Sequence, residues 1–146
     1  MTGQPVEILL VEDNEDDIVI IQEELADMKL ATILNTVRDG EEALAYLQRK
    51  GKYKVVRMPD LVLLDINMPK MNGCEVLERI RKEPRLQSLP VIMLTMSQRE
   101  EDVVRAYAKG ACSFIHKPVG LAQFRECLKL FGHYWTHVSQ VPVVKE

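Results

Sequence analysis

The stretch Leu9-Leu10-Val11-Glu12-Asp13-Asn14-Glu15-Asp16-Asp17 decides how this chain folds. Its first residues continue an apolar run of the kind that forms a buried strand, and the run ends abruptly in carboxylates. Apolar residues then recur at helical spacing from Ile18. The change of period predicts a strand followed by a helix. Two adjacent acids where the strand leaves the core repel each other, so they are either the solvated start of the helix or one side of a cation site.

The same strand-and-helix pattern occurs five times along the chain. The expected strands are Val6–Val11, Thr32–Val37, Asp60–Asp65, Pro90–Thr95 and Ala111–His116. Thr32–Val37 alternates more than the others and is expected at an edge of the sheet. Five strand-and-helix units in strict alternation predict an α/β fold with a central parallel sheet.

Local signals mark several helix ends. Asp39-x-x-Glu42 and Ser97-x-x-Glu100 are capping-box patterns that start helices, and Gly110 is expected to end one. Residues 49–59 are predicted to form the longest loop. The tail after Gly132, which finishes in VPVVKE, is predicted to be irregular.

Length and composition indicate one domain. The chain has 146 residues, of which 47% are apolar and 28% charged, and its net charge is −3. We expect a single domain over 1–146, with a core over 6–131 and a C-terminal extension over 132–146. The acidic balance disfavours nucleic-acid binding, and the sequence contains neither a membrane-spanning apolar run nor a signal peptide. Three cysteines without C-x-x-C spacing fit a cytoplasmic location.

Polar side chains stand at the carboxyl end of every inner strand, where open parallel sheets bind ligands. These residues are Glu12 and Asp13, Asp65, Thr95 and Lys117. Each pair of like charges about 4 Å apart costs about 4 kcal/mol at an effective dielectric constant of 20. A divalent cation would nearly cancel the excess, and oxygen ligands alone select Mg²⁺.

Two other polar groups have plainer interpretations. Asp16 and Asp17 are expected to form the solvated first turn of a helix, where acids are favoured anyway, rather than to join the cation site. His133 and His137 are four residues apart, a spacing that zinc-binding pairs use. Without a third ligand or a catalytic glutamate, however, that spacing by itself does not indicate a site.

Four motifs in order, VEDN, LLDINMPKMNG, PVIMLT and FIHKP, resemble the receiver domain of two-component response regulators. The resemblance runs from about Val6 to Phe131. It implies a doubly wound, flavodoxin-like fold, in which a five-stranded parallel sheet of order 2-1-3-4-5 is flanked by five helices. It also implies a signalling protein that catalyses only its own phosphorylation and dephosphorylation, and is not otherwise an enzyme.

The resemblance assigns roles residue by residue. Asp65 matches the phosphate-accepting aspartate, Asp13 the direct metal ligand, and Glu12 an acid that acts through a water. Asn67 matches the position whose backbone carbonyl binds the metal. Thr95 matches the hydroxyl residue that contacts the phosphoryl group, and Lys117 matches the family's invariant lysine and precedes an expected cis bond to Pro118. Phe114 falls at the switch aromatic position, which makes Thr95 and Phe114 the switch pair.

Two departures from the family pattern affect the switch. Met96 follows Thr95 where many receivers have a small residue, and Phe114 stands where tyrosine is frequent and so cannot donate a hydrogen bond. Neither change removes a group with a catalytic role.

The loop MPKMNG, the insertion Arg49–Pro59 and the tail HYW further resemble stand-alone regulators that pair with bacterial and cyanobacterial phytochromes. This implies a sensor histidine kinase, with a phytochrome as the candidate, as the partner. We also expect a homodimer that uses Tyr134 and Trp135.

Three rival functions fit the sequence less well. A phosphatase with paired aspartates would need an acid where Asn67 stands, and a receiver-like module that never takes phosphate would not need the full set of polar strand ends. A nucleotide-binding protein lacks its glycine-rich motif here.

Overall fold

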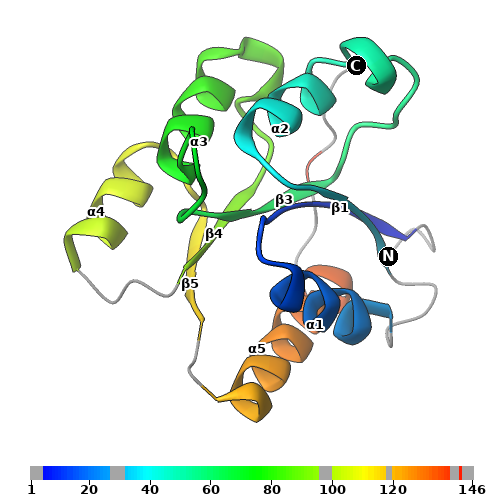
Figure 1. Ribbon diagram of the computed structural model, residues 1–146, viewed down its shortest axis with the longest axis vertical. Helices are drawn as coiled ribbons and strands as arrows, with labels where there is room; N and C mark the ends of the chain where they lie inside the picture. The colour runs from blue at the N-terminus through cyan, green and yellow to red at the C-terminus, as the bar shows by residue number, and fades with distance from the viewer. Residues whose placement is uncertain (1–4, 27–31, 96–99, 118–119, 139–141, 143–146) are drawn as a thin grey trace.

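The computed structural model describes residues 5–26, 32–95, 100–117, 120–138 and 142, and shows three layers (Figure 1). A five-stranded sheet forms the middle layer. Helices α2, α3 and α4 cover one face, and helices α1 and α5 cover the other. This arrangement is the doubly wound α/β fold that the resemblance implies, built around the central sheet that the alternating pattern predicts.

The sheet is parallel throughout, with strand order β2-β1-β3-β4-β5. Its strands are β1 (Val6–Val11), β2 (Thr32–Val37), β3 (Leu61–Asp65), β4 (Val91–Thr95) and β5 (Ser113–His116). The order confirms the expected 2-1-3-4-5 topology, with Thr32–Val37 at an edge. The last three strands begin one or two residues later than predicted. At β4 the reason is that Pro90 has no N–H to donate to a neighbouring strand.

The helices of the structure occupy the segments between the strands. They are α1 (Glu15–Ala26), α2 (Gly40–Leu47), α3 (Gly73–Lys82), α4 (Glu100–Ala108) and α5 (Leu121–His133), with short 3₁₀ turns η2 (Gly51–Tyr53) and η3 (Pro84–Leu86) and a π-helical turn η4 (Tyr134–Val138). Asp39 caps α2 by accepting a hydrogen bond from the Glu42 backbone N–H at 2.8 Å, as its capping box predicts. Gly110, with φ of +101°, follows α4 closely as expected. The predicted Ser97 cap lies outside the described residues.

Residues 49–59 form a connection without α-helix or strand, as predicted, and it includes the short 3₁₀ turn η2. The prediction of an irregular tail was wrong for its first part, because the chain after Gly132 continues as helix to Val138, and of the residues beyond it only 142 is described. The tail stays helical because Thr136 donates its hydroxyl hydrogen to the carbonyl of Gly132 at 2.7 Å, while Trp135 packs against the core below α5.

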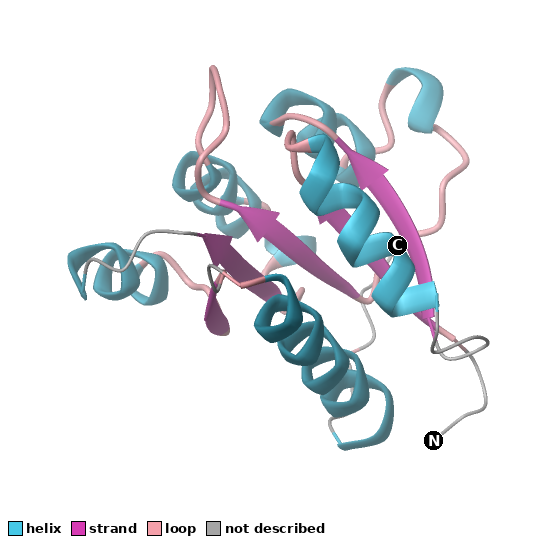
Figure 2. Ribbon diagram, turned by 60° about the horizontal axis from the view of Figure 1, so that its bottom comes forward, coloured by secondary structure: helices cyan, strands magenta, loops and turns pink. Residues whose placement is uncertain are grey.

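Both faces of the sheet are buried, which explains the unbroken apolar runs. Alternate residues of β1 point to opposite sides, so that Leu9 and Val11 join the core under α2 and α3, while Ile8 and Leu10 join the core under α1 and α5. Figure 2 brings the second face forward, with its helices in front of the strands. Among the described helices, none is both long and apolar enough to cross a bilayer.

Candidate acidic site at the carboxyl edge of the sheet

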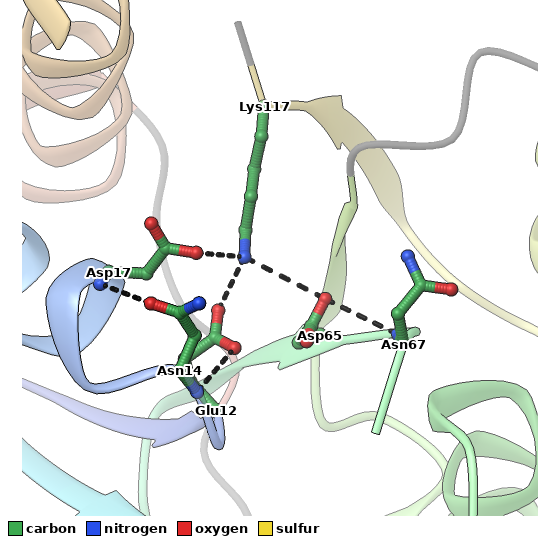
Figure 3. Close-up of polar contacts among 6 residues, drawn as sticks. All are labelled: Glu12, Asn14, Asp17, Asp65, Asn67 and Lys117. Atoms are coloured by element: carbon green, nitrogen blue, oxygen red, sulfur yellow. Dashed lines mark hydrogen bonds and ion pairs between the residues drawn. The ribbon is translucent and has the colours of Figure 1, made fainter. Parts of the chain in front are cut away.

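The acids predicted from two separate stretches of sequence meet at the carboxyl edge of the sheet, and Figure 3 shows Glu12 and Asp65 among them. Glu12 and Asp13 follow β1, and Asp65 is the last residue of β3, the strand beside β1. One carboxylate oxygen from each lies within 4.8 Å of the others. Glu12 is fully buried and Asp65 is 4% exposed, whereas Asp13 faces solvent. The cluster is therefore open on the side of Asp13.

Lys117, which follows β5, reaches across the edge of the sheet into this cluster. Its Nζ lies 2.6 Å from Glu12 Oε1, 2.7 Å from Asp17 Oδ2 and 3.8 Å from Asp65 Oδ1. The lysine is 6% exposed, so its charge is almost removed from water. A buried ammonium of this kind requires close anionic partners, and the acids supply them.

Asp17 belongs to this network, which corrects its interpretation as a purely solvated residue of the first helical turn. Its backbone N–H donates to Asn14 Oδ1 at 3.0 Å, so Asn14 caps α1, and its carboxylate turns inward to Lys117. Asn14 also donates its backbone N–H to Glu12 Oε2 at 3.3 Å. The sequence carried the signal for the cap, an Asn three residues before an acid, but nothing in it fixed the direction of the Asp17 side chain. Asp16 is exposed, as expected.

The loop after β3 closes the other side of the cluster. The backbone N–H of Asn67 lies 3.4 Å from Asp65 Oδ1, and the backbone N–H of Gly73 donates to the Ile66 carbonyl at 2.9 Å. A Cβ at Gly73 would overlap the carbonyl oxygen of Asp65 and lie 2.8 Å from Ile66 Cα. Only glycine allows α3 to start this close to β3. Lys70 in the same loop has φ of +69°, an uncommon backbone conformation for a residue with a side chain.

Electrostatics at the site favour a proton on Asp65 and a charge on Lys117. Burial, reinforced by the charge of Glu12, raises the pKa of Asp65 to about 8. Burial also opposes the charged form of Lys117, but its bonds to Asp17 and Glu12, with the nearby Asp65, outweigh this and raise the pKa of the ammonium. The single positive charge of Lys117 thus does not neutralise the negative charge of all the carboxylates around it.

The donor set fits the cation inferred from the sequence. Glu12, Asp13 and Asp65 offer carboxylate oxygens and neither nitrogen nor sulfur. With Lys117 included, the three acids carry an excess of negative charge that a divalent cation would offset. Hard oxygen ligands, few in number and open to water on one side, suit Mg²⁺ or Mn²⁺.

The remaining predicted residues are placed only in part. Thr95 ends β4 and pairs in register with His116, which brings its backbone to the same edge, but its side chain lies outside the described residues. Met96 and the bond to Pro118 lie outside them as well. Phe114 is half-buried and packs against the core under α2 and α3.

Comparison with known proteins agrees with this geometry. The family model described as the response regulator receiver domain matches residues 8–129. Response regulator Rcp1 of Synechocystis is 36% identical over 141 residues, covering 97% of this chain and 96% of Rcp1. A crystal structure of the Mn²⁺-bound form of Rcp1 superposes with a TM-score of 0.90 at 35% identity, covering 95% of this chain and all of the other.

Several solved relatives carry phytochrome-related names. The phosphorylated cyanobacterial phytochrome response regulator RcpA has a TM-score of 0.91 at 40% identity, covering 95% of this chain and 99% of its own. The bacteriophytochrome response regulator AtBRR has a TM-score of 0.71 at 38% identity, covering 94% and 99%. The chain therefore belongs to the response regulator receiver domain family, is a signalling protein of that family, and is similar to its phytochrome response regulators.

Proposed function

We propose that the protein accepts a phosphoryl group from a sensor histidine kinase onto Asp65, in a Mg²⁺-dependent reaction, and signals in the cytoplasm by conformational change or dimerisation. In this proposal residues 1–146 act as one receiver unit, with the core at 6–131 and the extension at 132–146. The observation that carries it is the convergence of Asp65, Asp13, Glu12 and Lys117, which are distant in sequence, at one edge of the sheet.

The chemistry begins with an ionised Asp65. One carboxylate oxygen attacks the phosphorus of a phosphohistidine on the kinase, the new P–O bond forms as the P–N bond breaks, and the electron pair leaves with the imidazole, which takes up a proton. Lys117 lies 3.8 Å from Asp65 Oδ1 and would offset charge on the phosphoryl oxygens. Thr95, at the end of the adjacent strand, would contact the same oxygens.

A metal requirement follows from the protonation state of Asp65. With a pKa of about 8, the carboxyl would be mostly protonated at neutral pH and a poor nucleophile. Asp13 and Asp65 would hold Mg²⁺ directly, with Glu12 acting through a water and Asn67 through its backbone carbonyl. When bound, the ion would supply the positive charge that favours the ionised carboxylate and offsets the phosphoryl charge.

The kinase partner is proposed from the names of the relatives, and the conformational output from the positions of Thr95 and Phe114. RcpA is named as a phytochrome response regulator, which supports a phytochrome as the kinase. For output, movement of Thr95 toward a phosphoryl group would let Phe114, half-buried in β5, change its packing. This is a population shift of about 1–3 kcal/mol rather than an absolute switch.

A homodimer is the second part of the output proposal. Leu130 and Tyr134 lie one turn apart at the end of α5 and are 64% and 49% exposed. Trp135 is partly buried against the core, so Tyr134 and Leu130 are the better candidates for the contact. Sedimentation velocity of wild type and Tyr134→Ser, with and without phosphorylation, tests this. A wild-type monomer under both conditions would rule out the homodimer.

Intact-mass measurement tests the phosphorylation. Incubation with acetyl phosphate and Mg²⁺ should add one phosphoryl group to wild type and none to Asp65→Asn, and chelation of the metal should prevent the addition. Asp16→Asn, which removes an exposed acid of the neighbouring helical turn, is the matched control and should be phosphorylated normally. A phosphoryl group that still appears on Asp65→Asn would contradict the assignment.

A further inference from the structure

The end of α5 carries two histidines whose rings stack on each other. His133 is the last residue of α5 and His137 lies in the π-helical turn η4. Their ring centroids are 4.8 Å apart, with 13° between the planes, and both side chains are exposed. Two imidazoles are therefore held close together at the surface, with their ring planes nearly parallel.

A buried threonine between them fixes which nitrogen of His137 is available. Thr136 is 5% exposed, and its Oγ1 lies 2.7 Å from the carbonyl oxygen of Gly132 and 2.6 Å from Nδ1 of His137. A carbonyl can only accept, so the single hydroxyl hydrogen goes to Gly132. Thr136 must then accept from His137, which requires a hydrogen on Nδ1. In the neutral ring, Nε2 of His137 is left with its lone pair free.

We infer that His133 and His137 form a two-imidazole binding site for a late divalent transition metal such as Zn²⁺, Ni²⁺ or Cu²⁺. A histidine that donates one ring N–H to an oxygen and presents the other nitrogen is the usual form of a metal ligand. Metal–nitrogen bonds of about 2.0–2.1 Å at a tetrahedral angle need nitrogens about 3.4 Å apart. Nearly parallel rings cannot both aim an in-plane lone pair at one ion, so the exposed ring of His133, which has no hydrogen-bond partner among the described residues, must turn out of the stack to bind. Waters complete the coordination.

This site differs from the acidic cluster in chemistry and position. Imidazole nitrogen favours Zn²⁺, Ni²⁺ and Cu²⁺, whereas the carboxylates around Asp65 favour Mg²⁺ and Mn²⁺. Helix α5 begins near the carboxyl edge of the sheet and runs back for 13 residues, which corresponds to about 20 Å. The two sites can therefore be tested separately. A metal held by His133 and His137 would also bridge the two ends of the segment that contains Tyr134 and Trp135.

Calorimetric titration with Zn²⁺ and Ni²⁺, in excess Mg²⁺, tests the inference. Wild type should show a binding event that is absent from His133→Ala and from His137→Ala. The event should remain in Asp65→Asn and in His116→Gln, which changes the third histidine of the chain. Thr136→Val should weaken binding about tenfold or more, and Thr136→Ser, which keeps the hydroxyl, should restore it.

Fluorescence supplies a second readout that locates the metal. Trp135 is the single tryptophan of the chain and lies between the two histidines in sequence, so Cu²⁺ bound there should quench its emission. Quenching should disappear in His137→Ala, with circular dichroism verifying that the variant is folded. Identical titrations for wild type and both histidine variants would overturn the inference, as would an event lost in Asp65→Asn but kept in the histidine variants.

Discussion

Replacing Asp65 with asparagine should stabilise the protein when no metal is bound. Burial and the charge of Glu12 raise the pKa of Asp65 from 3.8 to about 8, and the residue is 4% exposed. The folded state therefore holds a proton on this carboxyl over a pH range in which the unfolded state has released it. Because the folded state binds more protons, stability falls as pH rises from about 4 to about 8. Asparagine removes this dependence.

The magnitude follows from the size of the shift. A pH of 7 is about three units above the pKa of the carboxyl in the unfolded state, where the group is ionised. In the folded state the carboxyl is still mostly protonated at this pH. Each unit corresponds to about 1.4 kcal/mol, so Asp65→Asn should gain at most about 4 kcal/mol at pH 7, against about 1.5 kcal/mol at pH 5. Bound Mg²⁺ favours the ionised carboxylate, so it should reduce the gain.

Urea denaturation of wild type and Asp65→Asn measures this gain directly. The experiment compares pH 5 with pH 8, first with a chelator and then with excess Mg²⁺. Asp16→Asn removes an equal charge from an exposed position and should change stability by less than about 0.5 kcal/mol. If the advantage of Asp65→Asn with the chelator is the same at pH 5 and pH 8, the raised pKa and the electrostatic argument built on it are refuted.

Three further substitutions probe the same edge of the sheet. Lys117→Met should destabilise the metal-free protein by about 3 kcal/mol in urea denaturation, because it leaves buried Glu12 without a cation. Adding Glu12→Gln to this variant should restore part of the lost stability. Gly73→Ala should lower the free energy of unfolding by about 2 kcal/mol or more and slow phosphorylation from acetyl phosphate, because its Cβ would overlap the backbone of Asp65. A variant as stable as wild type would contradict the close approach of α3 to β3. Asp17→Asn should cost about 1 kcal/mol and leave Asp65 able to accept phosphate, and loss of phosphorylation by mass would mean that Asp17 does more than hold Lys117.

Local sequence was sufficient for the elements and for much of the site. The unbroken apolar runs could only be strands buried on both faces, and the alternation with helices implied a parallel sheet, so the strand ends had to share one edge. That is why Glu12, Asp13, Asp65 and Lys117 could be assigned together before any geometry was known. The cap at Asp39 was equally readable, because it depends on residues within one turn of it.

The prediction failed where a contact between distant segments decides the outcome. Asp17 looks like any acid in a first helical turn, and it turns inward because Lys117, 100 residues later, lies within reach. The tail looked irregular because its polar residues hide the core contact of Trp135 and the bond from Thr136 to Gly132.

The order of apolar runs and acids along the chain thus determined by itself the α/β class with its parallel sheet, the edge that bears the acidic cluster and the identity of its acids, since those follow from short-range periodicity and the direction of parallel strands. Only tertiary structure decided how deeply each acid is buried, which acids Lys117 contacts, and how the rings of His133 and His137 stack. Burial and charge pairing depend on the summed packing of all neighbours, and the pKa of Asp65 depends on both.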